Sequence, residues 1–201
     1  MLPHLGKTDI YLIDQFMKNR ITPDMRILDA GCGWGRNSEL LVRNNFQIWG
    51  IDKREEAIAD LQQLLPQWNK NYDKFRFTIA DLESIPFPDG HFDFIISNAV
   101  LHFSENRAHF IQLMEEMIRV LSPTGIIWFR MTAKHTIESR ATHLYDDIYR
   151  LPDESTRYLL DKEVLEKVMK THHLKYLDPF KTINVCDIRT MATVVLSAST
   201  K

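Results

Sequence analysis

The stretch that decides the fold of this chain is Ile27-Leu28-Asp29-Ala30-Gly31-Cys32-Gly33-Trp34-Gly35-Arg36-Asn37-Ser38. It begins as an apolar strand, becomes a turn with glycine at three alternate positions, and ends where an amphipathic helix starts. Glycine tolerates positive φ and lets the backbone approach a ligand closely. The first turn of a helix has N–H groups without intrahelical partners. The stretch therefore predicts a turn that binds a nucleotide or a nucleoside.

The residues at the two ends of this turn indicate which ligand it suits. Dinucleotide-binding turns have the pattern G-x-G-x-x-G and hold a pyrophosphate, but Arg36 stands where the third glycine should be. The carboxylate of Asp29 would also repel a pyrophosphate. It suits a ligand with a cationic or zwitterionic centre, such as S-adenosylmethionine. The alternative is a glycine-rich connection that binds nothing.

A second carboxylate ends the next predicted strand, residues 46–52. Asp52 follows Gly35 by seventeen residues, which fits the helix and return strand of a βαβ unit. Its carboxylate can accept hydrogen bonds from the 2′- and 3′-hydroxyl groups of a ribose. The neighbouring Lys53 can contact the edge of the adenosine with its backbone N–H or its aliphatic stem. Alternatively, Asp52 caps the helix predicted at residues 55–65, which Pro66 closes.

Further strands and helices follow along the chain. Residues 92–98 form a continuous apolar run, which is typical of a parallel strand buried on both faces. The other predicted strands are residues 75–80, 125–132, 174–180 and 190–197, and the other predicted helices are residues 105–121 and 162–170, the latter capped by Asp161.

The glycine turn, Asp52 and the acid after the third strand, Asp81, together resemble the signature of class I S-adenosylmethionine-dependent methyltransferases. Residues 119–125 (Arg-Val-Leu-Ser-Pro-Thr-Gly) match a further motif common in that family. The chain is most similar to the small single-domain type that includes tellurite-resistance and other small-molecule methyltransferases. The resemblance runs from residue 21 to the last strand. It implies an α/β fold, a Rossmann-like three-layer sandwich with a seven-stranded, mostly parallel sheet whose last strand is antiparallel.

The resemblance also implies roles for individual residues. The position of Asp81 recognises the exocyclic amine of adenine in this family, and the backbone N–H of Leu82 donates to a ring nitrogen. The end of the fourth strand, at Ser97, should border the methyl group, because open α/β sheets bind ligands beyond their strand ends. The predicted cofactor-binding residues are Asp29, Gly31, Cys32, Gly33, Arg36, Asp52, Lys53, Asp81, Leu82 and Ser97.

A candidate catalytic residue is His102, whose pKa would suit a general base for an oxygen or nitrogen nucleophile. Alternatively, it packs beside the adenosine or caps the turn at residues 104–105. Methyl transfer to sulfur or to an anionic oxygen needs no base, because catalysis can come from holding the nucleophile in line. The catalytic residues are therefore left open. Residues 97–100 (Ser-Asn-Ala-Val) also differ from the Asn or Asp, Pro-Pro and aromatic typical of base-amine methyltransferases.

Arg36 lies in the first turn of a helix, where the macrodipole opposes a cation. A salt bridge to a neighbouring acid would compensate for this. So would pairing with the carboxylate of the cofactor or with an anionic substrate. The sequence Gly-Arg-Asn-Ser also occurs in tellurite-resistance-like members, which supports the second interpretation.

We interpret residues 1–201 as a single methyltransferase domain with two added segments. Residues 1–24 form an N-terminal helical segment capped by Thr8 or Asp9, and Tyr11 is its candidate contact with the cofactor. Its apolar residues at helical spacing, expected to pack on the sheet, are Ile10, Ile13, Phe16 and Met17. Residues 133–160 are polar, poorly periodic and longer than a normal connection. They are predicted to be a substrate lid, and a surface helix with a loop is the alternative.

Composition narrows the class of protein. A net charge of −2 gives no general attraction to nucleic acid or to anionic membranes. The first residues have no basic stretch followed by an apolar one, so we expect no secretion, and no apolar run is long enough to span a bilayer. Cys32 and Cys186 lack metal-ligand spacing, and His135 and His143 have no further ligands nearby, so no metal site is predicted. We expect a cytoplasmic protein.

These observations predict a methyltransferase that moves the methyl group of S-adenosylmethionine in line to an oxygen, nitrogen or sulfur atom of a small molecule. The alternatives are an RNA or protein methyltransferase and a non-catalytic S-adenosylmethionine-binding protein. A nicotinamide-dependent oxidoreductase is disfavoured by Arg36 and by the position of Asp29.

Overall fold

The computed structural model describes residues 5–135, 137 and 139–198, so the first residues of the N-terminal segment and the last three of the chain lie outside the described part. The elements, in chain order, are α1 (Ile10–Met17), β1 (Arg26–Ala30), α2 (Ser38–Arg43), β2 (Gln47–Asp52), α3 (Glu55–Trp68), η1 (Lys74–Arg76), β3 (Phe77–Ile79), β4 (Phe92–Asn98), η2 (Leu101–Phe103), α4 (Arg107–Val120), β5 (Leu121–Thr132), β6 (Thr142–Tyr145), β7 (Ile148–Arg150), β8 (Thr156–Tyr158), α5 (Lys162–Thr171), β9 (Leu174–Tyr176), β10 (Lys181–Val185) and β11 (Arg189–Ala198).

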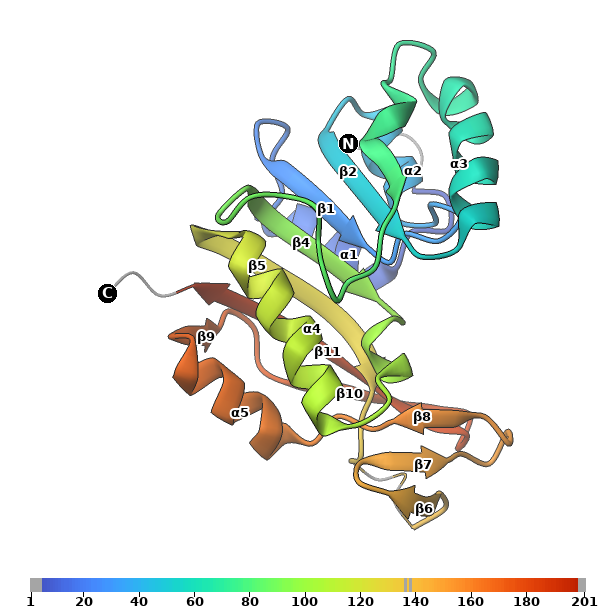
Figure 1. Ribbon diagram of the computed structural model, residues 1–201, viewed down its shortest axis with the longest axis vertical. Coiled ribbons are helices and arrows are strands. Elements are labelled where there is room, and N and C mark those ends of the chain that lie inside the picture. Colours follow the sequence, from blue (N-terminus) through green and yellow to red (C-terminus); the bar gives the residue numbers. More distant parts are fainter. Residues whose placement is uncertain (1–4, 136, 138, 199–201) are drawn as a thin grey trace.

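The main sheet has the order β10-β11-β5-β4-β1-β2-β3 (Figure 1). β1 to β5 are parallel to one another, and the last strand, β11, lies antiparallel between β5 and β10. β9 and β10 pair with successive stretches of the same edge of β11, so the sheet is seven strands wide. The predicted α/β fold with an antiparallel last strand is confirmed.

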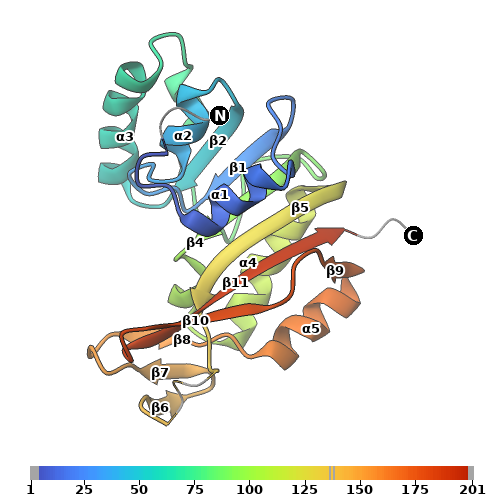
Figure 2. The same cartoon turned by 180° about the vertical axis from the view of Figure 1, so that it is seen from behind.

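Helices cover both faces of this sheet. Figures 1 and 2 show α4 and α5 on one face and α1 on the opposite face. One buried cluster joins α4 and α5 to the sheet, and a second joins α1, α2 and α3 to it. Neighbouring strand residues divide between the clusters, as with Ile27 and Leu28 of β1, because successive side chains point to opposite faces. Because β1 to β5 are parallel, their carboxyl ends lie at one edge of the sheet.

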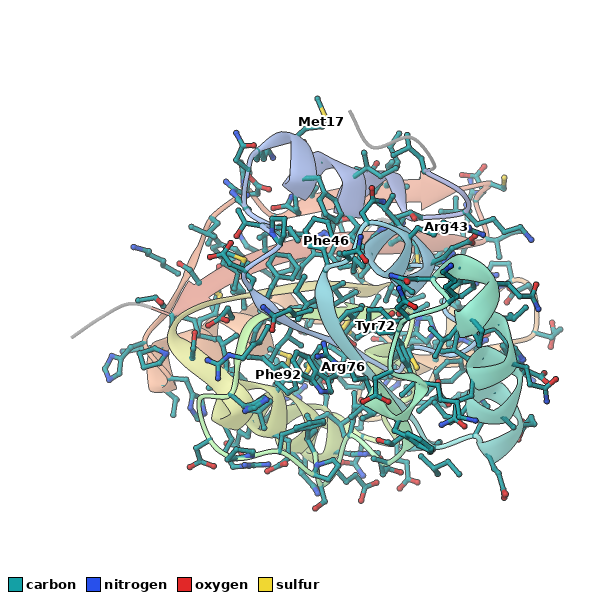
Figure 3. The ribbon with its side chains drawn as sticks, turned by 90° about the horizontal axis from the view of Figure 1, so that it is seen from above. Met17, Arg43, Phe46, Tyr72, Arg76 and Phe92 are labelled. Atoms are coloured by element: carbon teal, nitrogen blue, oxygen red, sulfur yellow. The ribbon has the colours of Figure 1, made fainter. Side chains whose placement is uncertain are left out.

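The helix α1 forms where predicted, but only part of its predicted apolar face packs on the sheet. Phe16 packs against the buried cluster, whereas Ile10 and Met17 do not. Ile10 is 71% exposed and Met17 is 78% exposed, and Figure 3 shows Met17 pointing away from the body of the protein. Leu12 and Gln15 are buried instead, and Gln15 donates a hydrogen bond to Asp178 (3.1 Å). This long-range polar contact helps fix the rotation of a short helix whose apolar spacing alone did not determine its face.

Several predicted boundaries are wrong for local reasons. Pro66 does not close α3, because the helix continues to Trp68, whose ring packs against the buried cluster under α3. A proline near a helix end removes one N–H donor without ending the helix at that point. Residues 74–76 form a 3₁₀ turn because the Asp73 carboxylate accepts from the Phe75 N–H, so β3 is shorter than predicted.

The predicted strand at residues 174–180 is divided into β9 and β10. Asp178 lies between them and pairs with Arg20 (2.9 Å) and Lys18 (3.0 Å) of the N-terminal segment. Pro179, which has no N–H to donate, follows it. β5 begins at Leu121 because Leu121 pairs with Phe92, so α4 ends one residue earlier than predicted.

The segment predicted as a lid contains a small antiparallel sheet, β6-β7-β8, rather than a surface helix. Asp147, between β6 and β7, is 1% exposed and anchors this sheet. Its carboxylate accepts from Nε (2.7 Å) and Nη2 (3.1 Å) of Arg107 at the start of α4. It also pairs with Lys134, just after β5 (2.8 Å). The small sheet is therefore fixed beside the carboxyl ends of the central strands (Figure 1).

Candidate functional site

A cavity of about 560 Å³ lies where β1, β2, β3 and β4 end. It is lined by Gly31, Cys32, Gly33, Trp34, Arg36, Asp52, Lys53, Arg54, Ala80, Asp81, Leu82, Glu83, Asn98, Ala99, Val100, Phe103, His109 and Leu113. Eight of the ten predicted cofactor-binding residues are in this lining, and the other two, Asp29 and Ser97, are not. The carboxyl ends of parallel strands converge at one edge, and this is where open α/β sheets bind ligands.

The glycine turn shapes the floor of the cavity. Gly31 has a φ of +84°, and a Cβ atom added there would lie 2.3 Å from Cγ2 of Val100. The N–H groups of Gly31 and Cys32 donate to the Ile51 carbonyl (2.8 and 2.9 Å). The N–H of Gly33 donates to Oδ2 of Asp52 (2.8 Å). The N–H groups of the turn therefore hydrogen-bond to the end of β2 and join it to β1. The turn can contribute to ligand binding by letting a ligand come close to its backbone.

Asp29 lies beneath the turn and is 2% exposed. Its Oδ2 accepts a hydrogen bond from the hydroxyl of Ser38, the first residue of α2 (2.6 Å). Burial raises the pKa of the Asp29 carboxyl to about 6, while the Ser38 bond and the charge of Arg36 oppose that rise. In this position the carboxylate holds the start of α2 against the end of β1.

Asp52 ends β2, is 5% exposed and has four hydrogen bonds. Besides the Gly33 N–H, Oδ1 accepts from the backbone N–H of Arg54 (3.0 Å) and from its Nε (3.0 Å), and Oδ2 accepts from its Nη2 (3.2 Å). Burial acts to raise the pKa of this carboxyl. The hydrogen bonds from Arg54 and Gly33 outweigh burial and hold the pKa below its usual value.

Arg54 is a cavity residue that sequence reasoning missed. Its guanidinium lies over the ring of Trp34, 4.6 Å from the centroid. The available signal was its place at the N-cap of α3, where it makes no side-chain capping bond. An N-cap is usually Ser, Thr, Asp or Asn, so an arginine there indicates that its side chain has a role other than capping the helix.

Asp81 and Leu82 follow β3, and both line the cavity. Asp81 is exposed in the cavity, and its Oδ1 accepts from the Glu83 N–H (3.1 Å). Leu82 is 6% exposed and continues the apolar wall that Val100 and Leu113 also form. The end of β3 therefore places one carboxylate beside an apolar surface.

At the end of β4, the structure places Asn98 at the cavity and buries Ser97 completely. Successive side chains of a strand point to opposite faces, so a shift of one residue exchanges the cavity for the core. The Nδ2 group of Asn98 donates to Oδ2 of Asp9 (3.1 Å), which also pairs with Arg130. Arg130 lies over the ring of Tyr11 at 4.6 Å, and Tyr11 is not part of the cavity lining.

His102 is buried, 5% exposed, and lies outside the cavity lining. Burial lowers the pKa of its imidazole to about 4, with the charges of Arg157 and Arg189 acting in the same direction. The ring packs edge-on against Phe103 (4.5 Å between centroids), and Phe103 does line the cavity. A general-base role for His102 stays a prediction.

Arg36 is exposed at the cavity. Its guanidinium forms no ion pair with any acid in residues 5–135, 137 and 139–198. The interpretation as a structural salt bridge is therefore not supported, and this cation is free to meet an anion.

The described part of the chain holds no group of three or more His, Cys, Asp or Glu side chains that could bind a metal ion. Among the helices described, none has the length and apolar character needed to cross a membrane.

Comparison with known proteins gives the same fold and a family match. Residues 28–129 match the model of a methyltransferase domain. The chain is 32% identical over 112 residues to the biotin biosynthesis bifunctional protein BioHC of Teredinibacter turnerae, which covers 53% of the chain and 19% of the relative. It is 30% identical over 135 residues to a malonyl-[acyl-carrier protein] O-methyltransferase of Legionella pneumophila, which covers 65% of the chain and 44% of the relative.

A solved structure shows the similarity across nearly the whole chain. A SAM-dependent methyltransferase from Methanosarcina mazei superimposes with a TM-score of 0.76 at 20% identity, and the match covers 92% of this chain and 98% of that one. In contrast, the chain spans less than half the length of the two curated relatives. The structural match therefore supports the fold over nearly the whole chain.

Proposed function

The chain belongs to the methyltransferase domain family, and from this premise we propose that it transfers the methyl group of S-adenosylmethionine to a small-molecule acceptor. The observation that carries the proposal is the convergence of the glycine turn, Asp52 and Asp81 on one cavity. A volume of about 560 Å³ falls within the range of small-molecule and cofactor sites. Its apolar walls suit an adenine ring, and its buried carboxylate suits a ribose.

The lining residues and Asp29 beneath them have distinct proposed roles. Asp52 accepts from the ribose hydroxyl groups, and Lys53 flanks the adenosine. Asp81 accepts from the adenine amine while the Leu82 N–H donates to the ring. Gly31, Cys32 and Gly33 let the ligand approach the turn, and Asp29 supports the turn through Ser38. Arg36, which has no acid partner in the described residues, pairs with the carboxylate of the cofactor.

The cofactor supplies a methyl group activated by its sulfonium. The protein binds and orients the two reactants and excludes water, which is sufficient for a sulfur or anionic oxygen nucleophile. Asn98, at the end of β4, lines the cavity and is the proposed neighbour of the methyl group. We assign no general base, because the imidazole of His102 is buried outside the lining.

The small sheet β6-β7-β8 is the proposed acceptor-binding segment. It is held beside the strand ends by Asp147, and Arg157 of β8 lies over the cavity residue Phe103 at 4.8 Å. Relatives are named for methylation of malonyl-[acyl-carrier protein] and of 2-methyl-6-phytyl-1,4-hydroquinone, which supports a metabolite rather than a nucleic acid as the acceptor.

We also propose a cytoplasmic location for the protein. Both cysteines are free, as is usual for proteins of a reducing compartment.

Thermal unfolding with S-adenosylhomocysteine and with NADH tests the proposed cofactor. A ligand at about a hundred times its dissociation constant adds ~2.7 kcal/mol to stability. For a chain of this size, this corresponds to an increase in Tm of roughly 5–10 °C. We expect that increase with S-adenosylhomocysteine and none with NADH. A shift with NADH alone would contradict the proposal.

Arg36→Gln tests the proposed partner of Arg36. We expect S-adenosylhomocysteine to bind about 10-fold more weakly, because a charge-assisted hydrogen bond at an exposed site contributes about 1.5 kcal/mol. Adenosine, which has no amino-acid carboxylate, should bind the variant and the wild type equally. Titration calorimetry measures both, with Arg43→Gln on the outer side of α2 as the matched control. Equal weakening for both ligands would show that Arg36 does not pair with the carboxylate.

A further inference from the structure

The carboxylate of Asp52 has no acceptor position left for a ribose. A carboxylate offers about four lone-pair positions on its two oxygens. In this structure Oδ1 accepts from two donors of Arg54, and Oδ2 accepts from Gly33 and from Arg54. Two of the four donors are backbone N–H groups, and the other two belong to the guanidinium. A ribose diol also needs two positions, so it can bind only where the guanidinium is now.

The guanidinium also covers the backbone that a ligand must approach. A Cβ atom added to Gly33 would lie 3.2 Å from Nη2 of Arg54. The side chain of Arg54 therefore lies across the open face of the glycine turn. The same side chain and the ring of Trp34 both line the cavity.

We propose that Arg54 is an internal occupant of the ribose position, and that a ligand with a vicinal diol binds by displacing its guanidinium from Asp52. The inference rests on the proposed function, since it assigns the ribose to Asp52. It adds that the guanidinium of Arg54 competes with the ribose for the carboxylate of Asp52, and that affinity for the cofactor is reduced by the strength of this ion pair.

The surroundings of Arg54 make this exchange feasible. Its side chain is 46% exposed, whereas that of Asp52 is 7% exposed, so the arginine is the partner free to move. Trp34 is 49% exposed, and its Nε1 donates to Asp60 (3.0 Å), which holds the ring in place. The two backbone donors stay on Asp52 and keep the carboxylate ionised and oriented when the guanidinium leaves.

Removal of the occupant should therefore tighten binding. For Arg54→Ala we expect the dissociation constant of S-adenosylhomocysteine to fall roughly 5- to 10-fold, because the ligand no longer has to break a partly exposed ion pair. Arg54→Lys keeps the charge and loses the two-pronged geometry, so it should lie between wild type and Arg54→Ala. Arg43→Ala removes the same charge from a helix surface and should leave the constant unchanged.

A pair of neutral nucleosides isolates the ribose. Adenosine should gain the same factor as S-adenosylhomocysteine in Arg54→Ala. By contrast, 2′,3′-dideoxyadenosine has no diol to place on Asp52, does not compete with Arg54, and should bind wild type and variant equally. Titration calorimetry or ligand-detected magnetic resonance measures these constants. Equal or weaker binding of adenosine by a folded Arg54→Ala, or by Arg54→Lys if Arg54→Ala does not fold, would overturn the inference.

The wild-type protein gives a second measurement that needs no variant at Arg54. Release of the guanidinium from its stacked position should change the emission of Trp34 when S-adenosylhomocysteine is added, and the change should be absent in Trp34→Phe. If S-adenosylhomocysteine binds neither wild type nor Arg54→Ala, the proposed function fails. If it binds both equally, only the role of Arg54 fails.

Discussion

Asp52→Asn is expected to weaken the binding of S-adenosylhomocysteine about 10- to 30-fold. Asparagine keeps the shape of the side chain but has one acceptor oxygen, so one ribose hydroxyl would meet an NH₂ donor. Each hydrogen bond to a charged group contributes about 1.5–3 kcal/mol. Loss of the charge and of one acceptor therefore costs the ligand about 3 kcal/mol, and the weaker competition from Arg54 returns about 1 kcal/mol. The net loss corresponds to about 10- to 30-fold in the dissociation constant. Titration calorimetry checks this expectation.

The control for Asp52→Asn is Glu56→Gln in the first turn of α3, which removes a nearby exposed carboxylate without touching Asp52. It should bind the ligand as the wild type does. The double variant Asp52→Asn with Arg54→Ala separates the two roles at this position. It should stay weak, because removal of the occupant cannot restore the lost acceptor. Binding by Asp52→Asn within about threefold of wild type would show that the ribose is held elsewhere.

Gly31→Ala is expected to lower the free energy of unfolding by about 3 kcal/mol and to abolish ligand binding. The left-handed conformation at a φ of +84° costs an alanine about 1–2 kcal/mol. The added Cβ would lie 2.3 Å from Cγ2 of Val100, and overpacking of this kind costs about 1–3 kcal/mol. Denaturant unfolding gives the first quantity, and calorimetry gives the second.

Two further variants separate conformation from contact. Gly90→Ala has a similar φ of +67°, but the nearest atom to its added Cβ is the Leu121 carbonyl oxygen at 4.0 Å. It should lose only the conformational part, about 1–2 kcal/mol. The double variant Gly31→Ala with Val100→Ala should recover part of the loss by removing the contact. Equal losses for Gly31→Ala and Gly90→Ala would contradict the role of Val100.

Much of the fold could be predicted because its signals are local. The order of strand, glycine turn and helix around Gly31, and the carboxylates that end β2 and follow β3, can be read within short windows. Parallel strands then bring their carboxyl ends to one edge, which explains why eight predicted residues line one cavity. The predictions differ from the structure where two local signals compete, as at Pro66, where the helix continues past a proline. They also differ where a shift of one residue decides which side chain faces the cavity, as at Ser97 and Asn98.

Other features depend on contacts that no short window contains. The buried face of α1 is fixed by Gln15 and Asp178, which are 163 residues apart. The small sheet is anchored through Asp147 to Arg107, 40 residues away. Periodicity reports only that a side chain is apolar or polar, and a polar side chain that finds a buried partner breaks the pattern.

The sequence by itself determined the class of fold, the strand ends that form the site, and most of the residues around the cavity, because each follows from glycine, apolar spacing and charge along a few consecutive positions. Only the tertiary structure decided which of those residues contact one another. Arg54 stands two positions after Asp52 and reads as the start of a helix. Its pairing with a buried carboxylate, over Gly33 and Trp34, exists because β1 and β2 lie side by side and bring the glycine turn to the end of the next strand.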